Sequence, residues 1–237
     1  MKLTFVGTRA NIDVLSEQHK KHSLLAISQG EDHHGISIWI DCGKDWQDTI
    51  ESIRPRPQAI FLTHSHEDHA EGLRYQTPTH VYATEETWDI IEDYAIPEYN
   101  RHVIATQETI TKGNNLSITP YNVFHSVHAP AVGYKITNGT CTIFYASDLA
   151  SIENPKEALD GVHLYIGDGS IIDRNILVRE HSGQPTGHAS IEEQLKWCSD
   201  NGIKQALLLN YLIVYGCITL LLLSCDVLCI DITCLLR

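Results

Sequence analysis

Residues 59–73 have the sequence AIFLTHSHEDHAEGL, an apolar run followed directly by a cluster of histidine and acidic side chains. The apolar run predicts a buried strand, and a helix is expected to begin just after the histidines. His64 and His66 are two residues apart at the end of this strand, so both can point toward one pocket. Asp68 and His69 follow on the turn, where they can face a second ion. Because imidazole and carboxylate are ligands of zinc, manganese and iron, the stretch predicts a metal centre.

The pattern HxHxDH at residues 64–69, placed after a buried strand, resembles the hallmark of the metallo-β-lactamase superfamily. The resemblance covers roughly residues 1–210 of the chain. It implies an α/β (α+β) fold class, a four-layer αββα metallo-β-lactamase sandwich. The alternation of predicted strands and helices agrees with such a layered domain.

The resemblance assigns roles to three more stretches. The strand ending in IWIDCG at residues 38–43 matches the family's DxG motif, so Asp41 is expected to support the ligands by hydrogen bonding. Of His125 and His128, we favour His125 as a metal ligand because it directly follows a predicted strand. His128 is then a loop residue that contacts substrate or only solvent. Asp148 matches the aspartate that bridges two metal ions, its alternative being a cap of the turn that follows.

One expected ligand is missing from the sequence. The family supplies a last histidine at the end of its final core strand, but here that position is occupied by Asn210-Tyr211, and no histidine follows His188. The resemblance implies two divalent metal ions, Zn or Mn, with metal ligands His64, His66, Asp68, His69, His125 and Asp148. The missing histidine predicts that the second ion binds more weakly.

Within the superfamily, the sequence resembles most the phosphodiesterase branch, which contains tRNase Z and small cyclic-phosphate diesterases. Gly187-His188-Ala189-Ser190 at a predicted helix start matches the branch's histidine that contacts phosphate or protonates the leaving oxygen. The alternative is a surface histidine beside a helix. The resemblance therefore implies a metal-dependent hydrolase that uses metal-bound hydroxide, with Asp68 and His188 as catalytic residues.

A small or cyclic phosphodiester is the predicted substrate. The segment between His125 and Asp148 has room only for a hairpin, whereas tRNA-processing members of the branch carry a long inserted arm there. The formal net charge of −13 also opposes binding of a large folded nucleic acid. Two alternatives remain: a thioester or lactone hydrolase of the same fold, and a degenerate metal-binding domain without catalytic activity.

The composition, with 43% hydrophobic and 20% charged residues, is that of an ordinary globular protein. The N-terminus does not resemble a signal peptide, and Cys42, Cys141 and Cys198 form no CxxC pair. We therefore expect a cytoplasmic location with free thiols.

The chain changes character near its end. No charged residue occurs from Ala206 to Cys225, and the remaining four cysteines lie between Cys217 and Cys234. We predict a hydrolase domain at residues 1–210 and an atypical apolar, cysteine-rich tail at residues 211–237. The tail is interpreted in three ways: as a membrane anchor, as a buried strand and helix, or as a terminus altered by a frame change or unspliced sequence. Association with a membrane is expected only through this tail, and the sequence does not predict an oligomeric state.

Secondary structure is predicted from apolar periodicity and from bounding Gly, Pro, Asn and Asp residues. The strands are Leu3–Val6, Ile36–Ile40, Ala59–Leu62, His80–Ala83, Ser117–Phe124, Val132–Ile136, Cys141–Ala146, Val162–Ile166 and Ala206–Leu209. The helices are Trp46–Ser52, Glu85–Asp93, Pro155–Leu159 and Ser190–Asn201. Ser190 is the expected N-cap of the last helix, and Asn138-Gly139 predicts a hairpin turn.

Overall fold

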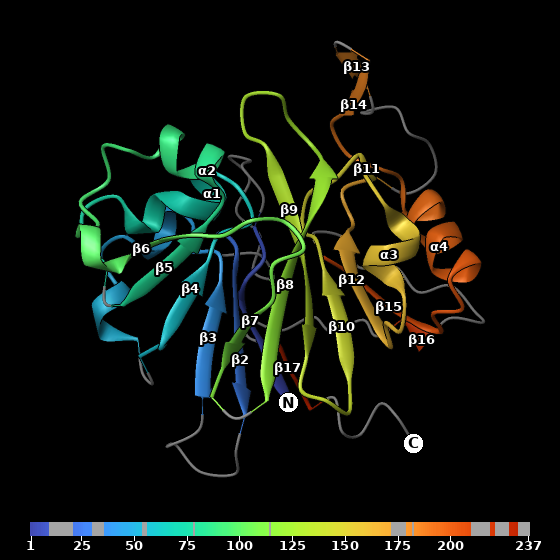
Figure 1. The fold of residues 1–237 in the computed structure, drawn as a ribbon, viewed down its shortest axis with the longest axis horizontal. Helices are drawn as coiled ribbons and strands as arrows, with labels where there is room; N and C mark the ends of the chain where they lie inside the picture. The colour runs from blue at the N-terminus through green and yellow to red at the C-terminus, as the bar shows by residue number, and fades with distance from the viewer. Residues whose placement is uncertain are drawn as a thin grey trace. The chain divides into compact units, whose positions relative to one another are not determined.

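The computed structural model forms two compact units, each built on one main sheet (Figure 1). Unit 1 comprises Met1–Ala105 with Ser224–Arg237, and unit 2 comprises Thr106–Leu223. The structure describes residues 1–9, 21–29, 36–53, 56–77, 79–113, 115–171, 179–181, 183–209, 219–220 and 228–231.

The sheet of unit 1 has the strand order β17-β1-β2-β3-β4-β5-β6 within the described residues. Strands β17, β1, β2 and β3 pair antiparallel, whereas β3, β4, β5 and β6 pair parallel. Parallel pairing brings the carboxyl ends of β3 and β4 to the same edge, where the metal-ligand motif begins. The strands are β1 Lys2–Gly7, β2 Leu24–Gln29, β3 Ile36–Ile40, β4 Ala59–Phe61, β5 His80–Ala83, β6 Arg101–Val103 and β17 Leu228–Asp231.

One face of this sheet packs against short helices. Trp39, Ile60 and Val81 lie side by side on β3, β4 and β5, and they share a buried cluster with Leu73 and Trp88. Burial of each such side chain contributes about 1.5–3 kcal/mol. The helical segments of unit 1 are η1 Lys44–Trp46, η2 Ile50–Ser52, α1 Glu67–Ala70, η3 Glu71–Leu73, α2 Glu85–Ile90 and η4 Glu98–Asn100.

The sheet of unit 2 has the order β11-β8-β9-β10-β12-β15-β16, and β7 also pairs with β8. Strands β10, β12 and β15 are parallel, so the turn after β10 and the end of β12 lie at the same edge. The strands of unit 2 are β7 Ile110–Lys112, β8 Leu116–Phe124, β9 Ala131–Thr137, β10 Thr142–Tyr145, β11 Ser151–Ile152, β12 Leu164–Asp168, β13 Arg179–His181, β14 Gln184–Thr186, β15 Gln205–Leu209 and β16 Thr219–Leu220.

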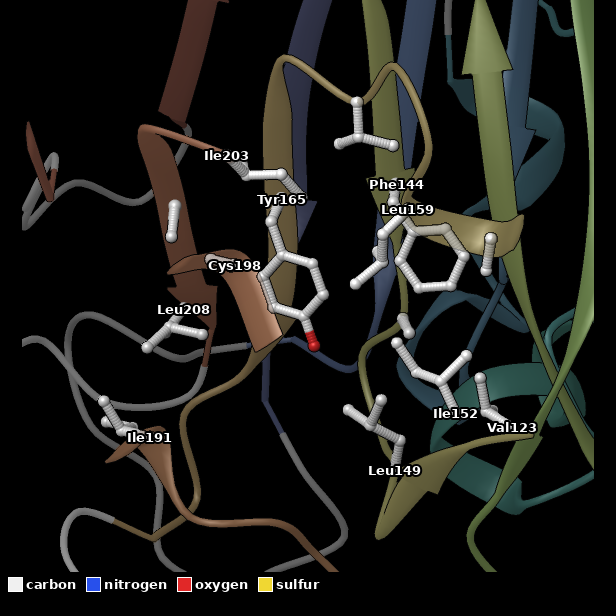
Figure 2. Packing of buried hydrophobic residues seen from close by; sticks show 14 of the residues in the cluster. Val123, Phe144, Leu149, Ile152, Leu159, Tyr165, Ile191, Cys198, Ile203 and Leu208 are labelled. Carbon is white, nitrogen blue, oxygen red and sulfur yellow. The ribbon is translucent and has the colours of Figure 1, made fainter. Parts of the chain in front are cut away.

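Helices α3 (Pro155–Leu159) and α4 (Ile191–Asp200) contribute to the core of unit 2 together with one face of its sheet. Figure 2 shows this core, in which the rings of Phe144 and Tyr165 stack with centroids 6.1 Å apart. Leu159 from α3 and Cys198 from α4 belong to the same cluster. The cluster therefore fixes the ends of β10 and β12 relative to the start of α4.

Most predicted elements are confirmed, with shifted boundaries. Strands β3 and β5 and helix α3 have the predicted bounds. Ser190 caps α4 by accepting a hydrogen bond from the backbone N–H of Glu193 at 3.2 Å. The hairpin turn is confirmed by the bond from the Asn138 N–H to the Cys141 carbonyl and by the positive φ of Gly139.

The prediction of one helix at Trp46–Ser52 is wrong. The structure has two short 3-10 segments there, η1 and η2. The Trp46 indole N–H donates to the backbone carbonyl of His22, and the Trp46 backbone N–H donates to Gly43. The bond to Gly43 is the local bond of the 3-10 turn, whereas the bond to His22 is a tertiary contact that holds this short turn in place of a regular helix.

Parts of the C-terminal segment add strands to both sheets. Strand β16 pairs parallel with β15, and β17 pairs antiparallel with β1. Asn210 and Tyr211 lie outside the described residues, and the boundary between 210 and 211 stays a prediction, as does a cytoplasmic location. Among the described segments, no helix has the length and hydropathy needed to cross a membrane.

Candidate metal centre and its supporting residues

The end of β4 brings His64 and His66 together in unit 1. The two rings lie with His64 Nε2 and His66 Nδ1 3.0 Å apart. His64 is buried, and His66 is partly exposed at the N-cap of α1. Two nitrogens at this separation can share one ion with bonds of about 2.0–2.1 Å. The two-residue spacing of His64 and His66 therefore brings their side chains together, as the sequence predicts.

Helix α1 carries a second pair of candidate ligands. His69 Nε2 lies 3.4 Å from Asp68 Oδ2, and both side chains are almost fully buried. The rings of His64 and His69 have centroids 4.2 Å apart. Unit 1 thus presents two pairs of candidate donor atoms, His64 with His66 and Asp68 with His69.

Buried polar groups beneath these ligands fix the orientation of two imidazoles. Asp41 Oδ2 accepts a hydrogen bond from His69 Nδ1 at 2.8 Å. The Thr63 hydroxyl lies 2.9 Å from the Asp41 carboxylate and 3.0 Å from His64 Nδ1. If this hydroxyl donates to Asp41, it accepts from His64 Nδ1–H. Both imidazoles then carry the proton on Nδ1, and Nε2 has the lone pair for a metal.

Asp41 is held in a costly conformation by the chain around it. It is fully buried and has φ 63°, a value that costs a non-glycine residue about 1–3 kcal/mol and is often found at functional sites. Burial raises the pKa of the Asp41 carboxyl, while the charge and hydrogen bond of His69 act in the opposite direction. The confirmed support of His69 by Asp41 explains why this strand ends in an acidic residue.

The glycine of the same DxG motif is required by a close approach. A Cβ atom on Gly43 would lie 2.2 Å from the carbonyl oxygen of Asp68. The loop is tied to α1 by the bond from the Cys42 N–H to the His69 carbonyl at 2.7 Å. Gly43 therefore lets the loop that carries Asp41 pack directly on the helix that carries the ligands.

Replacing Asp41 with asparagine is expected to weaken metal binding by about 10–100-fold, the usual effect of losing a carboxylate behind a metal-binding histidine. The amide has nearly the same shape, but it no longer provides a charged acceptor for His69 Nδ1–H. The measurement is the dissociation constant for Zn²⁺ by competition with a chromogenic chelator. Asp93→Asn, on the exposed surface ion pair with Arg74, is the control. Equal affinities in Asp41→Asn and the control would contradict the supporting role.

In unit 2, His125 follows β8 as predicted. Its Nδ1 donates to the backbone carbonyl of Gly187 at 3.0 Å, and the Gly187 N–H donates back to the His125 carbonyl at 2.7 Å. A carbonyl can only accept, so His125 also carries its proton on Nδ1. His125 is buried, whereas His128 lies in an exposed loop. The fixed orientation and the burial of His125 are thus consistent with the choice of His125, and not His128, as the candidate ligand.

Asp148, Asp168 and His188 form a compact cluster in unit 2. One donor atom from each lies within 4.8 Å of the others. His188 Nδ1 donates to Asp168 Oδ2 at 2.5 Å and lies 3.7 Å from Asp148 Oδ1. Asp168 is fully buried at the end of β12, and its other oxygen accepts from the Ser170 N–H at 2.8 Å. The arrangement is that of a carboxylate that orients an imidazole beside the predicted metal-bridging residue.

A buried glutamine joins the two chain segments that carry this pair. The side chain of Gln194 on α4 accepts from the Asp168 N–H at 2.9 Å and from the Tyr165 hydroxyl at 3.0 Å. Its amide donates to the Asp168 carbonyl at 2.6 Å and contacts the Ala189 carbonyl at 3.2 Å. Gln194 therefore fixes the end of β12 against the residue that follows His188.

Sequence reasoning assigned no role to Asp168 or Gln194. The sequence signal for Asp168 is its position at the end of an apolar strand. Many turn residues occupy such a position, so the signal does not distinguish a functional aspartate. Gln194 lies on a predicted helix, where nothing distinguishes a buried glutamine from an exposed one. Tyr211, at the position of the missing histidine, lies outside the described residues.

The comparisons with known proteins agree with these features. The sequence model of the family described as the beta-lactamase superfamily domain matches residues 37–211. Ribonuclease Z of Methanococcus maripaludis strain S2 is 32% identical over 160 residues, which are 57% of this chain and 49% of the relative. The chain therefore spans about half the length of this relative.

Solved structures show a likeness in fold. The short form of human tRNase Z gives a TM-score of 0.70 at 17% identity and covers 98% of this chain and 99% of its own. A diphosphatase from the PhnP family gives a TM-score of 0.65 at 16% identity, and the match covers 97% of this chain and 97% of the diphosphatase.

These matches confirm the predicted αββα metallo-β-lactamase fold class and the resemblance to the branch that contains tRNase Z. The chain therefore belongs to the beta-lactamase superfamily, as a metallo-β-lactamase-fold protein whose clustered histidines and carboxylates imply binding of divalent metal.

Proposed function

We propose that this chain is a metal-dependent hydrolase of phosphodiesters. The observation that carries the proposal is the hydrogen bond between His188 Nδ1 and Asp168 Oδ2, 2.5 Å long, beside the carboxylate of Asp148. An oriented imidazole next to a metal-bridging carboxylate is suited to a phosphoryl group, which needs both charge neutralisation and a proton for its leaving oxygen. The proposed metal ligands are His64, His66, Asp68, His69, His125 and Asp148.

The donor chemistry of these residues fits zinc or manganese. The set has imidazoles and carboxylates, without a thiolate. His69 and His125 each donate from Nδ1 to an oxygen acceptor, and His64 does the same when the Thr63 hydroxyl donates to Asp41. Divalent ions held by such ligands supply Lewis acidity and a nucleophile at neutral pH. We propose two ions per chain, the second bound more weakly because the family's last histidine is absent.

His188 has the proposed role of contacting the phosphate and protonating the leaving oxygen. Its Nδ1–H donates to Asp168, so Nε2 is the atom proposed to face the substrate. As a general acid His188 carries a proton on both ring nitrogens: the Nε2 proton passes to the leaving oxygen, and Nδ1–H stays bonded to Asp168. Asp168 is buried and acts on the substrate only through this imidazole, which makes it a positioning residue. Asp68 is proposed to act in catalysis as a ligand from unit 1.

The proposed substrate is a small or cyclic phosphodiester. All residues between His125 and Asp148 are described, and they form a loop and then the hairpin of β9 and β10 closed at Asn138 and Gly139. This hairpin offers no extended arm to hold a folded RNA, and the net charge of −13 disfavours a polyanion. The similarity to ribonuclease Z makes an RNA substrate the main competing outcome.

Metal content and substrate class can be measured together. The whole chain is loaded with Zn²⁺ or Mn²⁺, analysed by elemental mass spectrometry and assayed on bis(p-nitrophenyl) phosphate, a cyclic nucleotide, a short RNA and a thioester. We expect turnover of the first two substrates. Turnover of RNA alone would overturn the substrate class, and turnover of the thioester alone would overturn the reaction class. Bound metal without any turnover would identify a degenerate domain.

A further inference from the structure

We propose that His80 and His102 form a separate binding site for one divalent transition ion, with Cu²⁺ preferred over Ni²⁺ and Zn²⁺. His80 begins β5 and His102 lies in the middle of β6. His80 Nδ1 and His102 Nε2 are 3.0 Å apart, and the rings meet nearly edge to face with centroids 5.0 Å apart. These histidines play no part in the proposed hydrolytic site.

The pair lies at the other end of the sheet from the ligands at residues 64–69. In the parallel ladder, His80 is the register partner of Ala59, the first residue of β4. His64 comes five residues after Ala59, beyond the end of β4. Among the described residues, no group of three or more candidate ligands within 4.8 Å of one another includes His80 or His102. Binding at His80 and His102 is therefore independent of the clusters that contain the residues at 64–69.

The separation of the two nitrogens allows them to share one ion. With bonds of about 2.0–2.1 Å, nitrogens 3.0 Å apart subtend an angle of about 90–100° at that ion. His64 Nε2 and His66 Nδ1 have the same separation, so the distance does not by itself select the metal. The preference for Cu²⁺ rests on its affinity for nitrogen ligands, which is the strongest among the divalent ions of this row.

The strands hold both rings in place before an ion arrives. His102 is in register with Tyr82, and their rings stack with centroids 4.6 Å apart. Tyr82 in turn stacks on the buried Phe61 at 4.7 Å. His80 lies two residues before Tyr82 on the same face of β5. Because little side-chain freedom is lost on binding, two protein ligands with water in the remaining positions suffice for a stable complex.

The test uses diethyl pyrocarbonate, which modifies imidazole nitrogens whose lone pair is not bound to metal. The metal-free whole chain is labelled with and without Cu²⁺, and each histidine is followed by mass spectrometry of its peptide. At a Cu²⁺ concentration ten times the dissociation constant, labelling of His80 and His102 should slow about tenfold. His163, an exposed histidine on unit 2, is the control and should change little. Unchanged labelling of His80 and His102 would overturn the site.

Single variants distinguish a shared ion from two independent contacts. In His80→Ala, Cu²⁺ should no longer protect His102, and in His102→Ala it should no longer protect His80. Both variants should bind one Cu²⁺ ion per chain fewer than the parent, while His163→Ala should not. Protection of the remaining histidine in either variant would contradict the proposal. None of these measurements depends on turnover, so the result stands whether or not the proposed hydrolysis is found.

Discussion

Replacing His66 with alanine is expected to remove metal from the proposed hydrolytic centre and to lower phosphodiester turnover by roughly three orders of magnitude. Loss of a group that hydrogen-bonds to a metal ligand already lowers metal affinity or activity by about 10–100-fold. Loss of the ligand itself should lower them further. His66 contributes Nδ1 to a pair of nitrogens 3.0 Å apart, and its removal leaves His64 as the remaining member of that pair. The measurements are metal content by elemental mass spectrometry and the rate on bis(p-nitrophenyl) phosphate.

The fold should survive this substitution, because His66 is partly exposed and its side chain does not cap α1. Thermal unfolding of the metal-free proteins checks this directly. His163→Ala removes an imidazole from the surface of unit 2 and serves as the matched control. A His66→Ala protein with the metal content and turnover of the control would show that the HxHxDH motif is not the metal centre of this chain.

The fold and the clustering of candidate ligands in unit 1 could be predicted because their signal is local. An apolar strand followed by alternating histidines places ligands by chain geometry alone, and the DxG motif adds a carboxylate and a close approach that Gly43 permits. The prediction of Asp41 as a supporting residue is confirmed by its bond with His69. The roles of all six residues as metal ligands stay predictions: His64, His66, Asp68, His69, His125 and Asp148.

The residues that were missed depend on tertiary contacts. Asp168 acquires its importance from His188, which is twenty residues away in the sequence, and Gln194 from a network of buried hydrogen bonds. The helix predicted at Trp46–Ser52 failed for a similar reason, since the tertiary bond from the Trp46 indole to the His22 carbonyl overrides local propensity. Separation along the sequence hides such contacts from any reading of periodicity.

The second large effect is expected from His188→Ala. For a substrate with an alkyl leaving group, kcat should fall about 10²–10⁴-fold, the usual contribution of a general acid. For a p-nitrophenyl ester the loss should be much smaller, because p-nitrophenolate leaves without a proton. The contrast between leaving groups distinguishes proton donation from a purely structural role. Equal losses on both substrates would show that His188 does not protonate the leaving oxygen.

Asp168→Asn tests whether the carboxylate acts through His188. The neutral amide introduced by this substitution would not accept the Nδ1–H of His188 as strongly, so the variant should show the same dependence on leaving group with a smaller loss. If the two residues act as a unit, the double variant should be no slower than His188→Ala, and their effects should be far from additive. Asp160→Asn, an exposed aspartate of unit 2, is the control. Additive losses would mean that buried Asp168 supports the site by another route, through the end of β12 and its bonds with Gln194.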